Sequence, residues 1–453
     1  MLNCPNNPLS QRIASLPAFD CHTHIDTRHP VARGIHDVLL YHMVISELYA
    51  AGCPDGARMS EEPDEQEVEQ RVTRALPYFP LITNTSGYMA LRIILCDLFD
   101  WTEPVTVQNW RQLDARIKEY SARPNRLRQL MEKSNVKKYN TELWRRGDGS
   151  LNHYFNYSME WAFFTRAQWG RFDTALIELE HAWNHAEPCG PLPVTLTEDL
   201  INFKKKLKTV DDVKEAIAHF LDKTPYDDII AIASHLSTDV AYSSPTDADM
   251  AAAMARRADA TLADQGIYAS YIFNAYLNEY ERRGIKTVLQ FSTAAEPLPF
   301  ESGSKMRAET PFELAKIFNA HSGIHFNIHL ANHANNQIFC SLAREIPNMS
   351  LNGYWWHNFY PSFIPRVLSE RLDMLPVSKT VGYFSDAYCA EWAYAKQKYI
   401  RFFTAQVLSE RVSWGQFTED EAIGVAGQLL GGTSCKIFGV DFEAMQAQWA
   451  AQK

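Results

Sequence analysis

The chain lacks the segments that would place a protein in or across a membrane. Its 453 residues contain no apolar run of about 18 or more, the length that a transmembrane helix needs. The opening stretch, MLNCPNNPLSQRIASLPAF, has no charged region followed by an apolar one, so we expect no signal peptide. These two absences predict a cytoplasmic protein with no membrane partner.

An excess of basic charge and paired cysteines are absent as well. There are 44 Lys and Arg against 54 Asp and Glu, for a net charge of −10, which argues against a nucleic-acid partner. The local run NFKKKLK is typical of one face of a surface helix. The eight cysteines are scattered, with no CxxC pair, and we interpret them as reduced thiols rather than a disulfide framework.

No GxGxxG turn or Walker loop is present, which disfavours a nucleotide-binding open sheet. What is present is an alternation of strand and helix patterns through the C-terminal half. Four apolar strand patterns, each followed by a helix pattern, are IKTVLQFSTA, IHFNIHLA, MSLNGYWW and KTVGYFSD. Such alternation is typical of a parallel sheet covered by helices. We predict an α/β fold, a distorted (β/α)8 TIM barrel forming one domain over residues 1–453, with a mainly helical insertion after the first strand at about residues 54–141.

Polar residues follow the predicted strands at the end where barrels carry their chemistry. DCHTHID, after the first strand, places His22 and His24 two residues apart, so both imidazoles point the same way on an extended segment. Asp386 ends the last strand, which neighbours the first in a closed barrel. Two histidines and one carboxylate suit a single divalent metal, zinc first, with manganese or iron as alternatives. Two ordinary loop histidines are the competing interpretation of DCHTHID taken alone.

These residues are also where the chain resembles the amidohydrolase superfamily, and within it uronate (glucuronate) isomerase. The stretches that carry the narrower resemblance are LLYHMVISELYAAGCP, LNGYWWHNF, VGYFSDAYCAEWAYAKQKYIRFF and LLGGTSCKIFGV. The resemblance implies that His22, His24 and Asp386 hold the metal and that Asp386 takes part in proton transfer. It also implies that His42 faces the substrate as a second catalytic candidate.

The chain departs from the family at four positions. The family has Tyr, His, Arg and Arg where this sequence has Met43, Ser292, Ala334 and Tyr388. The lost guanidinium groups are of the kind that binds a sugar carboxylate in a bidentate manner. The candidates to bind the substrate in their place, or to stack on it, are Arg28, His329, His333, Trp355, His357 and Asn358.

Each of these candidates has a plainer explanation. A histidine at a helix start can cap or pack, a histidine on a buried strand is often a hydrogen-bonded core residue, and paired tryptophans usually pack. The functional interpretation rests on the position of these residues in loops after strands, where binding groups concentrate.

Three functions therefore stay open on the sequence. The first is a metal-dependent aldose–ketose isomerase acting on a uronate or a related acidic sugar, which would be its small-molecule partner. The second is a hydrolase of a lactone, ester or amide, or a decarboxylase, with one metal, and the third is a barrel without catalysis. The exact substrate, the metal and the oligomeric state, including a homo-oligomer, are not set by the sequence.

Overall fold

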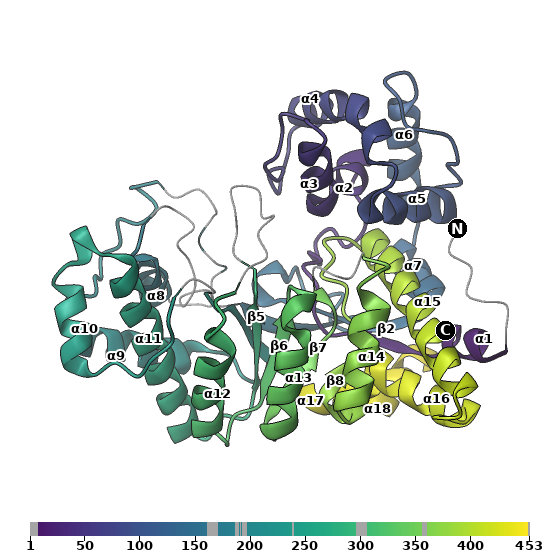
Figure 1. The fold of residues 1–453 in the computed structure, drawn as a ribbon. Helices are drawn as coiled ribbons and strands as arrows, with labels where there is room; N and C mark the ends of the chain where they lie inside the picture. Colours follow the sequence, from purple (N-terminus) through teal and green to yellow (C-terminus); the bar gives the residue numbers. More distant parts are fainter. Residues whose placement is uncertain are drawn as a thin grey trace.

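Eight parallel strands, hydrogen-bonded in chain order, form one curled sheet in the computed structural model (Figure 1). The structure describes residues 8–160, 171–185, 190, 192, 197–237, 240–295, 306–355 and 360–451. The sheet confirms the predicted distorted (β/α)8 barrel. The strands are β1 (Ala18–Asp20), β2 (Val136–Glu142), β3 (Phe155–Glu160), β4 (Ala231–His235), β5 (Val288–Thr293), β6 (Phe326–Leu330), β7 (Met349–Asn352) and β8 (Thr380–Val381).

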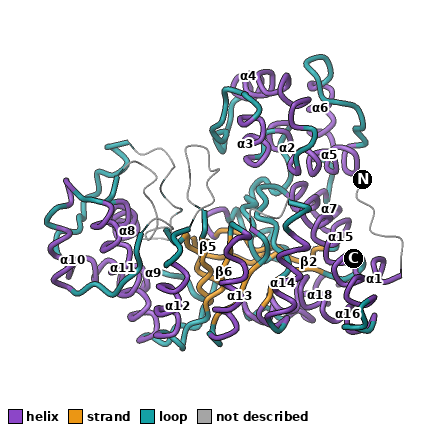
Figure 2. Tube along the Cα trace, in the orientation of Figure 1, coloured by secondary structure: helices purple, strands orange, loops and turns teal. Residues whose placement is uncertain are grey.

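In the described part of the chain an α-helix follows every strand except β2, after which comes the short 3-10 helix η2 (Leu143–Arg145), and the helices surround the strands (Figure 2). The four strand–helix units expected in the C-terminal half are all found, and the long helix before β5 ends where Gly284 adopts φ 68°. After β3, the helices are α8 (Thr174–Asn184), α9 (Val210–Lys223), α10 (Asp247–Met254), α11 (Leu262–Arg282), α12 (Thr310–Ala320), α13 (Asn336–Glu345), α14 (Ile364–Met374) and α15 (Ala390–Ser413).

The helical insertion lies between β1 and β2, and Figure 1 shows most of it stacked above the sheet. It begins at Ile35, earlier than residue 54, because two short apolar helices precede the charged stretch that signalled it. It ends at Ser134, because residues 136–142 form β2. This strand was not predicted, since its lysines and other polar residues are not typical of a buried strand. Its helices are α2 (Ile35–Leu39), α3 (His42–Ala50), α4 (Glu65–Ala75), η1 (Leu76–Ile82), α5 (Ser86–Phe99), α6 (Trp110–Ser121) and α7 (Arg126–Ser134).

The distortion of the barrel lies at the seam between β1 and β8, which are not paired as strands in the sheet. At one end of this seam the π-helical turn Gln428–Gly432 contacts both strands, and Gly382 N–H donates to the Leu429 carbonyl at 2.9 Å. A Cβ on Gly382 would lie 2.7 Å from the Leu429 side chain, so only glycine allows this approach. The turn Gln428–Gly432 thus packs between β1 and β8, where a closed barrel would have hydrogen bonds between the two strands.

The remaining helices belong to the ends of the chain. They are α1 (Pro8–Ala14), α16 (Glu419–Gly427), α17 (Thr433–Phe438) and α18 (Phe442–Ala451). None of the helices in the described residues has the length and apolar character needed to cross a membrane. The six cysteines within the described ranges are free thiols, as the sequence predicts.

Candidate metal centre

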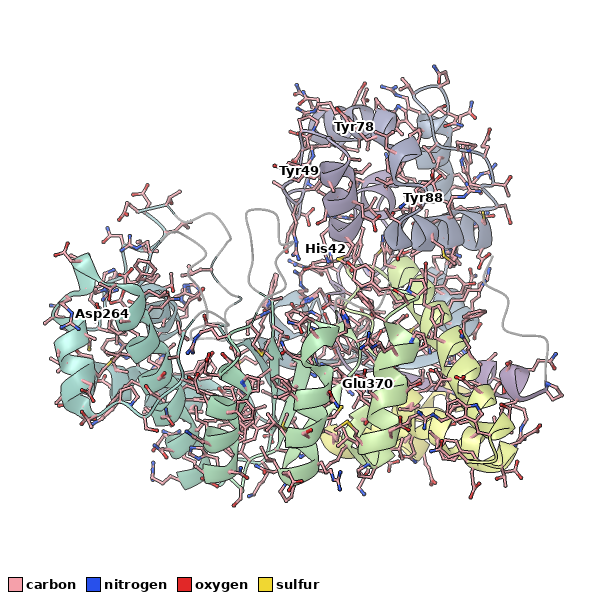
Figure 3. The ribbon with its side chains drawn as sticks, viewed as in Figure 1. His42, Tyr49, Tyr78, Tyr88, Asp264 and Glu370 are labelled. Atoms are coloured by element: carbon pink, nitrogen blue, oxygen red, sulfur yellow. The ribbon has the colours of Figure 1, made fainter. Side chains whose placement is uncertain are left out.

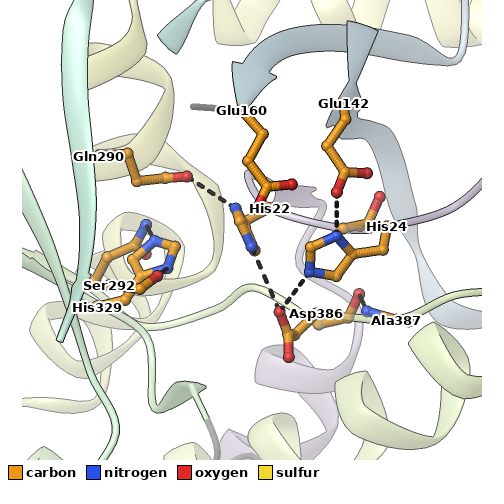
Figure 4. A network of polar contacts seen from close by, with 12 residues as sticks. His22, His24, Glu142, Glu160, Gln290, Ser292, His329, Asp386 and Ala387 are labelled. Atoms are coloured by element: carbon orange, nitrogen blue, oxygen red, sulfur yellow. Dashed lines mark hydrogen bonds and ion pairs between the residues drawn. The ribbon is translucent and has the colours of Figure 1, made fainter. Parts of the chain in front are cut away.

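His22, His24 and Asp386 meet at the open end of the seam between β1 and β8 (Figure 4). His24 Nε2 lies 3.2 Å and His22 Nε2 3.4 Å from Asp386 Oδ1. Ligand atoms about 2.1 Å from one tetrahedral ion would be about 3.4 Å apart, so this spacing suits a shared divalent metal. The structure therefore brings together the three residues that the sequence singles out.

The far nitrogen of each imidazole is held by an oxygen acceptor. His22 Nδ1 lies 2.8 Å from Gln290 Oε1 on β5, and His24 Nδ1 contacts Glu142 at the end of β2. With Nδ1–H donating to these oxygens, the neutral imidazole leaves the Nε2 lone pair for a metal. Two such Nε2 atoms facing one carboxylate oxygen need a cation or a proton between them, so the donor set fits a metal.

The same contacts set the pKa values of His24 and Asp386 when no metal is bound. Burial alone would lower the pKa of His24, but the charge of Glu142 and the hydrogen bond to Asp386 hold it well above its usual value. Burial would raise the pKa of Asp386, but the hydrogen bonds from both histidines hold it well below its usual range. A metal must therefore displace a proton from His24, so acid weakens its binding.

A chain of buried amides fixes the orientation of Gln290. Its Nε2 faces Asn327 Oδ1 at 3.4 Å, which leaves Oε1 for His22. Asn327 Oδ1 in turn accepts from Asn352 Nδ2 at 2.7 Å, and Asn327 Nδ2 donates to Ser350 Oγ at 2.9 Å. All four side chains are buried on β5, β6 and β7. These hydrogen bonds hold the Gln290 side chain in one orientation, with Oε1 facing His22.

Asp20 joins the two sides of the seam beneath the cluster. Its carboxylate accepts the Ser385 N–H and the Tyr383 hydroxyl, both at 2.9 Å, and the residue is fully buried. Burial raises its pKa to about 6. Asp20 therefore holds the β8 end against β1, a structural role next to the cluster.

The other predicted residues of the site are distributed unevenly around the cluster. The His329 ring lies 4.7 Å from that of His22, but its Nε2 is 2.8 Å from the Asn352 amide and its Nδ1 is 3.4 Å from Ser292 Oγ. Burial, with the charge of His22, holds its pKa well below the usual value. His329 is thus a neutral, hydrogen-bonded residue beside the cluster.

His42 begins α3 of the insertion, on the side of the insertion that faces the barrel (Figure 3). Its ring lies 5.4 Å from that of Tyr388, which stacks on His24 at 4.9 Å, so one aromatic ring separates His42 from the cluster. Burial, with the charges of Arg58 and Lys396, holds its pKa well below the usual value, so it is neutral near pH 7. His42 lines a pocket of about 150 Å³ together with Arg58, Arg145 and Tyr388.

The remaining candidates in the described residues contact groups other than the three members of the cluster. Arg28 forms an ion pair with Asp26 and its side chain is 53% exposed. The His333 ring stacks on Phe363, and Trp355 is buried with its ring 5.4 Å from that of His235. His357 and Asn358 lie outside the described residues.

The two residues that orient the candidate metal ligands, Glu142 and Gln290, were not predicted from the sequence. Glu142 was missed because its strand carries lysines and was placed inside the insertion. Gln290 carried a usable signal, because an uncharged polar residue within the apolar pattern VLQFST is unusual for a buried strand.

Comparison with known proteins finds solved structures with a similar fold. No family model and no curated protein sequence matches the chain. The glucuronate isomerase of Caulobacter crescentus superposes with a TM-score of 0.73 at 15% identity, covering 97% of this chain and 96% of that one. The uronate isomerase of Thermotoga maritima gives 0.70 at 13%, covering 95% and 96%. A Lactobacillus casei protein assigned as a metal-dependent hydrolase gives 0.53 at 13%, covering 95% and 97%. The chain has the uronate isomerase fold, and the resemblance stated from its motifs is confirmed at that level.

Proposed function

We propose that this chain is a metal-dependent aldose–ketose isomerase of a uronate or a related acidic sugar. The observation that carries the proposal is the meeting of His22, His24 and Asp386 at 3.2–3.4 Å within this fold. The overlap with two uronate isomerases over at least 95% of the chain supports the same conclusion, since it includes the insertion above the barrel.

The metal would be held by both Nε2 atoms and by Asp386 Oδ1. We propose one divalent ion, zinc first. When bound, such an ion polarises the carbonyl and the adjacent hydroxyl of the open-chain sugar. Gln290 and Glu142 keep the imidazoles oriented, because each accepts the proton of the far nitrogen.

The reaction moves a proton between two neighbouring carbons through an enediol. Asp386 is our candidate for the base, because its contacts with the two imidazoles both use Oδ1 and neither uses Oδ2. His42 is uncharged near pH 7 and would hydrogen-bond the sugar hydroxyls from the insertion side. In this assignment Asp386 transfers the proton and His42 positions the substrate.

In this proposal the Arg58 guanidinium binds the carboxylate of the sugar. Its Nη1 donates to the Tyr388 hydroxyl at 2.6 Å, and Tyr388 stands where the resemblance to uronate isomerase implies an arginine. The insertion thus contributes the Arg58 guanidinium to the pocket that Tyr388 also lines. Arg145 is less suited, because it is buried and paired with Glu142 and Glu61.

A hydrolase with one metal is the second candidate. It is favoured by Ser292, which stands where the resemblance to uronate isomerase implies a histidine, and whose Oγ here lies 3.4 Å from His329 Nδ1. The same three ligands would then serve to activate water for attack on a lactone, ester or amide.

One experiment separates the two functions. Metal-loaded protein is incubated with D-glucuronate and D-galacturonate, and separately with a panel of lactones and amides, and products are followed by NMR. We expect ketose signals from a uronate and none from a His22→Ala control. Hydrolysis of the panel without isomerisation of either uronate would replace the proposal with the second candidate.

A further inference from the structure

Asp386 has a main-chain conformation that the sheet does not impose. The residue lies beyond the end of β8 at Val381, and its φ is 55°. This left-handed region costs free energy for any residue with a side chain, although Asp reaches it more readily than most. Such a conformation persists only where the surroundings fix it.

The peptide groups on both sides of Asp386 are fixed by hydrogen bonds from distant parts of the chain. Its N–H donates to the His22 carbonyl at 3.0 Å. Its carbonyl oxygen accepts from the Tyr41 hydroxyl at 2.9 Å and lies 3.4 Å from Lys396 Nζ. The N–H side is thus held by the segment after β1 that carries the histidines, and the carbonyl side by Tyr41 and Lys396.

Tyr41 and Lys396 hold one another as well. Lys396 Nζ donates to the Tyr41 hydroxyl oxygen at 2.8 Å. Because an ammonium group only donates, the hydroxyl hydrogen of Tyr41 is left for the Asp386 carbonyl. The Tyr41 ring stacks on Trp392 at 4.3 Å, one turn before Lys396 on α15. Both Tyr41 and Lys396 are at most 4% exposed, so water does not compete for these bonds.

We propose that Tyr41 and Lys396 are positioning residues that aim the Asp386 carboxylate at the metal. They touch none of the three ligand atoms and act through the main chain of Asp386. The pair also ties the insertion to the metal centre, because Tyr41 directly precedes α3 and its His42. The inference rests on the metal centre of the proposed function but not on the identity of the substrate.

The test measures metal binding in Tyr41→Phe and Lys396→Met. Apo protein is titrated with Zn²⁺ against a chelator, and the visible spectrum of the Co²⁺-loaded protein reports the ligand geometry. We expect each variant to raise the Kd for Zn²⁺ by about tenfold or more, the usual effect of removing a group that orients a ligand. We also expect an altered Co²⁺ spectrum.

Tyr280→Phe is the matched control. Tyr280 is buried and its hydroxyl donates to the Thr287 main-chain carbonyl before β5, at the opposite end of the barrel. It should lose a comparable bond and leave both metal readouts unchanged.

Unchanged Kd and Co²⁺ spectrum in Tyr41→Phe, or an equal loss in Tyr280→Phe, would overturn the inference. If Lys396→Met does not fold, Tyr41→Phe decides alone. Wild-type protein that binds no metal would contradict the metal centre and this inference together, whereas wild-type binding with unaffected variants contradicts the inference alone.

Discussion

His24 Nε2 lies 3.2 Å from Asp386 Oδ1, although 362 positions of sequence separate the two residues. The contact exists because the segments that follow β1 and β8 are hydrogen-bonded to each other: His24 N–H donates to the Ala387 carbonyl at 2.8 Å, and Asp386 N–H donates to the His22 carbonyl at 3.0 Å. The meeting of these two segments, rather than any local motif, thus brings the candidate metal ligands together.

Replacing Asp386 with Asn should weaken metal retention and lower turnover by at least about 100-fold. The amide has a similar volume but is a poorer ligand and cannot act as a base. Metal raises the melting temperature of any protein that binds it in the folded state, so wild type should gain more than the variant. Differential scanning calorimetry with and without Zn²⁺ measures this gain. Near-full turnover in Asp386→Asn would show that the base lies elsewhere, with His42 as the next candidate.

Gln290→Leu should reduce metal affinity by about 10- to 100-fold, because His22 then loses the acceptor that orients it. Gln290→Glu keeps an acceptor oxygen for His22 but loses the amide donor that faces Asn327 Oδ1, so its affinity should be higher than that of Gln290→Leu. Chelator competition measures both variants. Equal affinity in Gln290→Leu and wild type would mean that His22 is oriented without Gln290.

Arg58→Ala should raise KM for the uronate by about tenfold or more, with a smaller change in kcat, if its guanidinium binds the carboxylate. Arg58→Lys should recover only part of the loss, since Lys lacks the bidentate fork. Arg111, an exposed arginine of the same insertion that pairs with Glu69, provides the control variant Arg111→Ala. A KM that does not respond to Arg58→Ala would remove Arg58 from substrate recognition.

The fold and the meeting of His22, His24 and Asp386 could be predicted from the sequence, for reasons visible in particular residues. The strands β5 to β8 are apolar runs between clear helix patterns, so their order and the polar residues at their ends could be predicted. Glu142 could not, because β2 carries Lys137 and Lys138 and resembles the charged helices before it. The contact between Tyr41 and Asp386 has no local signature, since it depends on how the insertion packs on α15.

Two histidines near β6 have different surroundings. His329 lies on the strand and its ring is 4.7 Å from that of His22. His325 lies before the first residue of the strand, with Nε2 2.9 Å from Ser350 Oγ. The direction of the strand accounts for the difference, because the groups of a barrel site lie at the carboxyl ends of the strands.

His325 should make stability depend on pH. Burial lowers its pKa to about 4, against an ordinary value of 6.5, so the unfolded chain binds more protons between these values. Stability from this group is complete above about pH 6.5 and is lost as the pH falls towards 4. Urea unfolding should show a contribution of about 2 kcal/mol lost between pH 7 and pH 5, absent in His325→Gln. An identical pH dependence in the variant would contradict this assignment.

An anomalous diffraction map at the zinc absorption edge, from crystals of the metal-loaded protein, tests the metal centre most directly. The account predicts one strong peak about 2.0–2.2 Å from His22 Nε2, His24 Nε2 and Asp386 Oδ1. The His22→Ala protein, prepared in the same way, should show no peak there. A map of the wild-type protein without density between these three atoms, or with the zinc bound by other residues, would contradict the account.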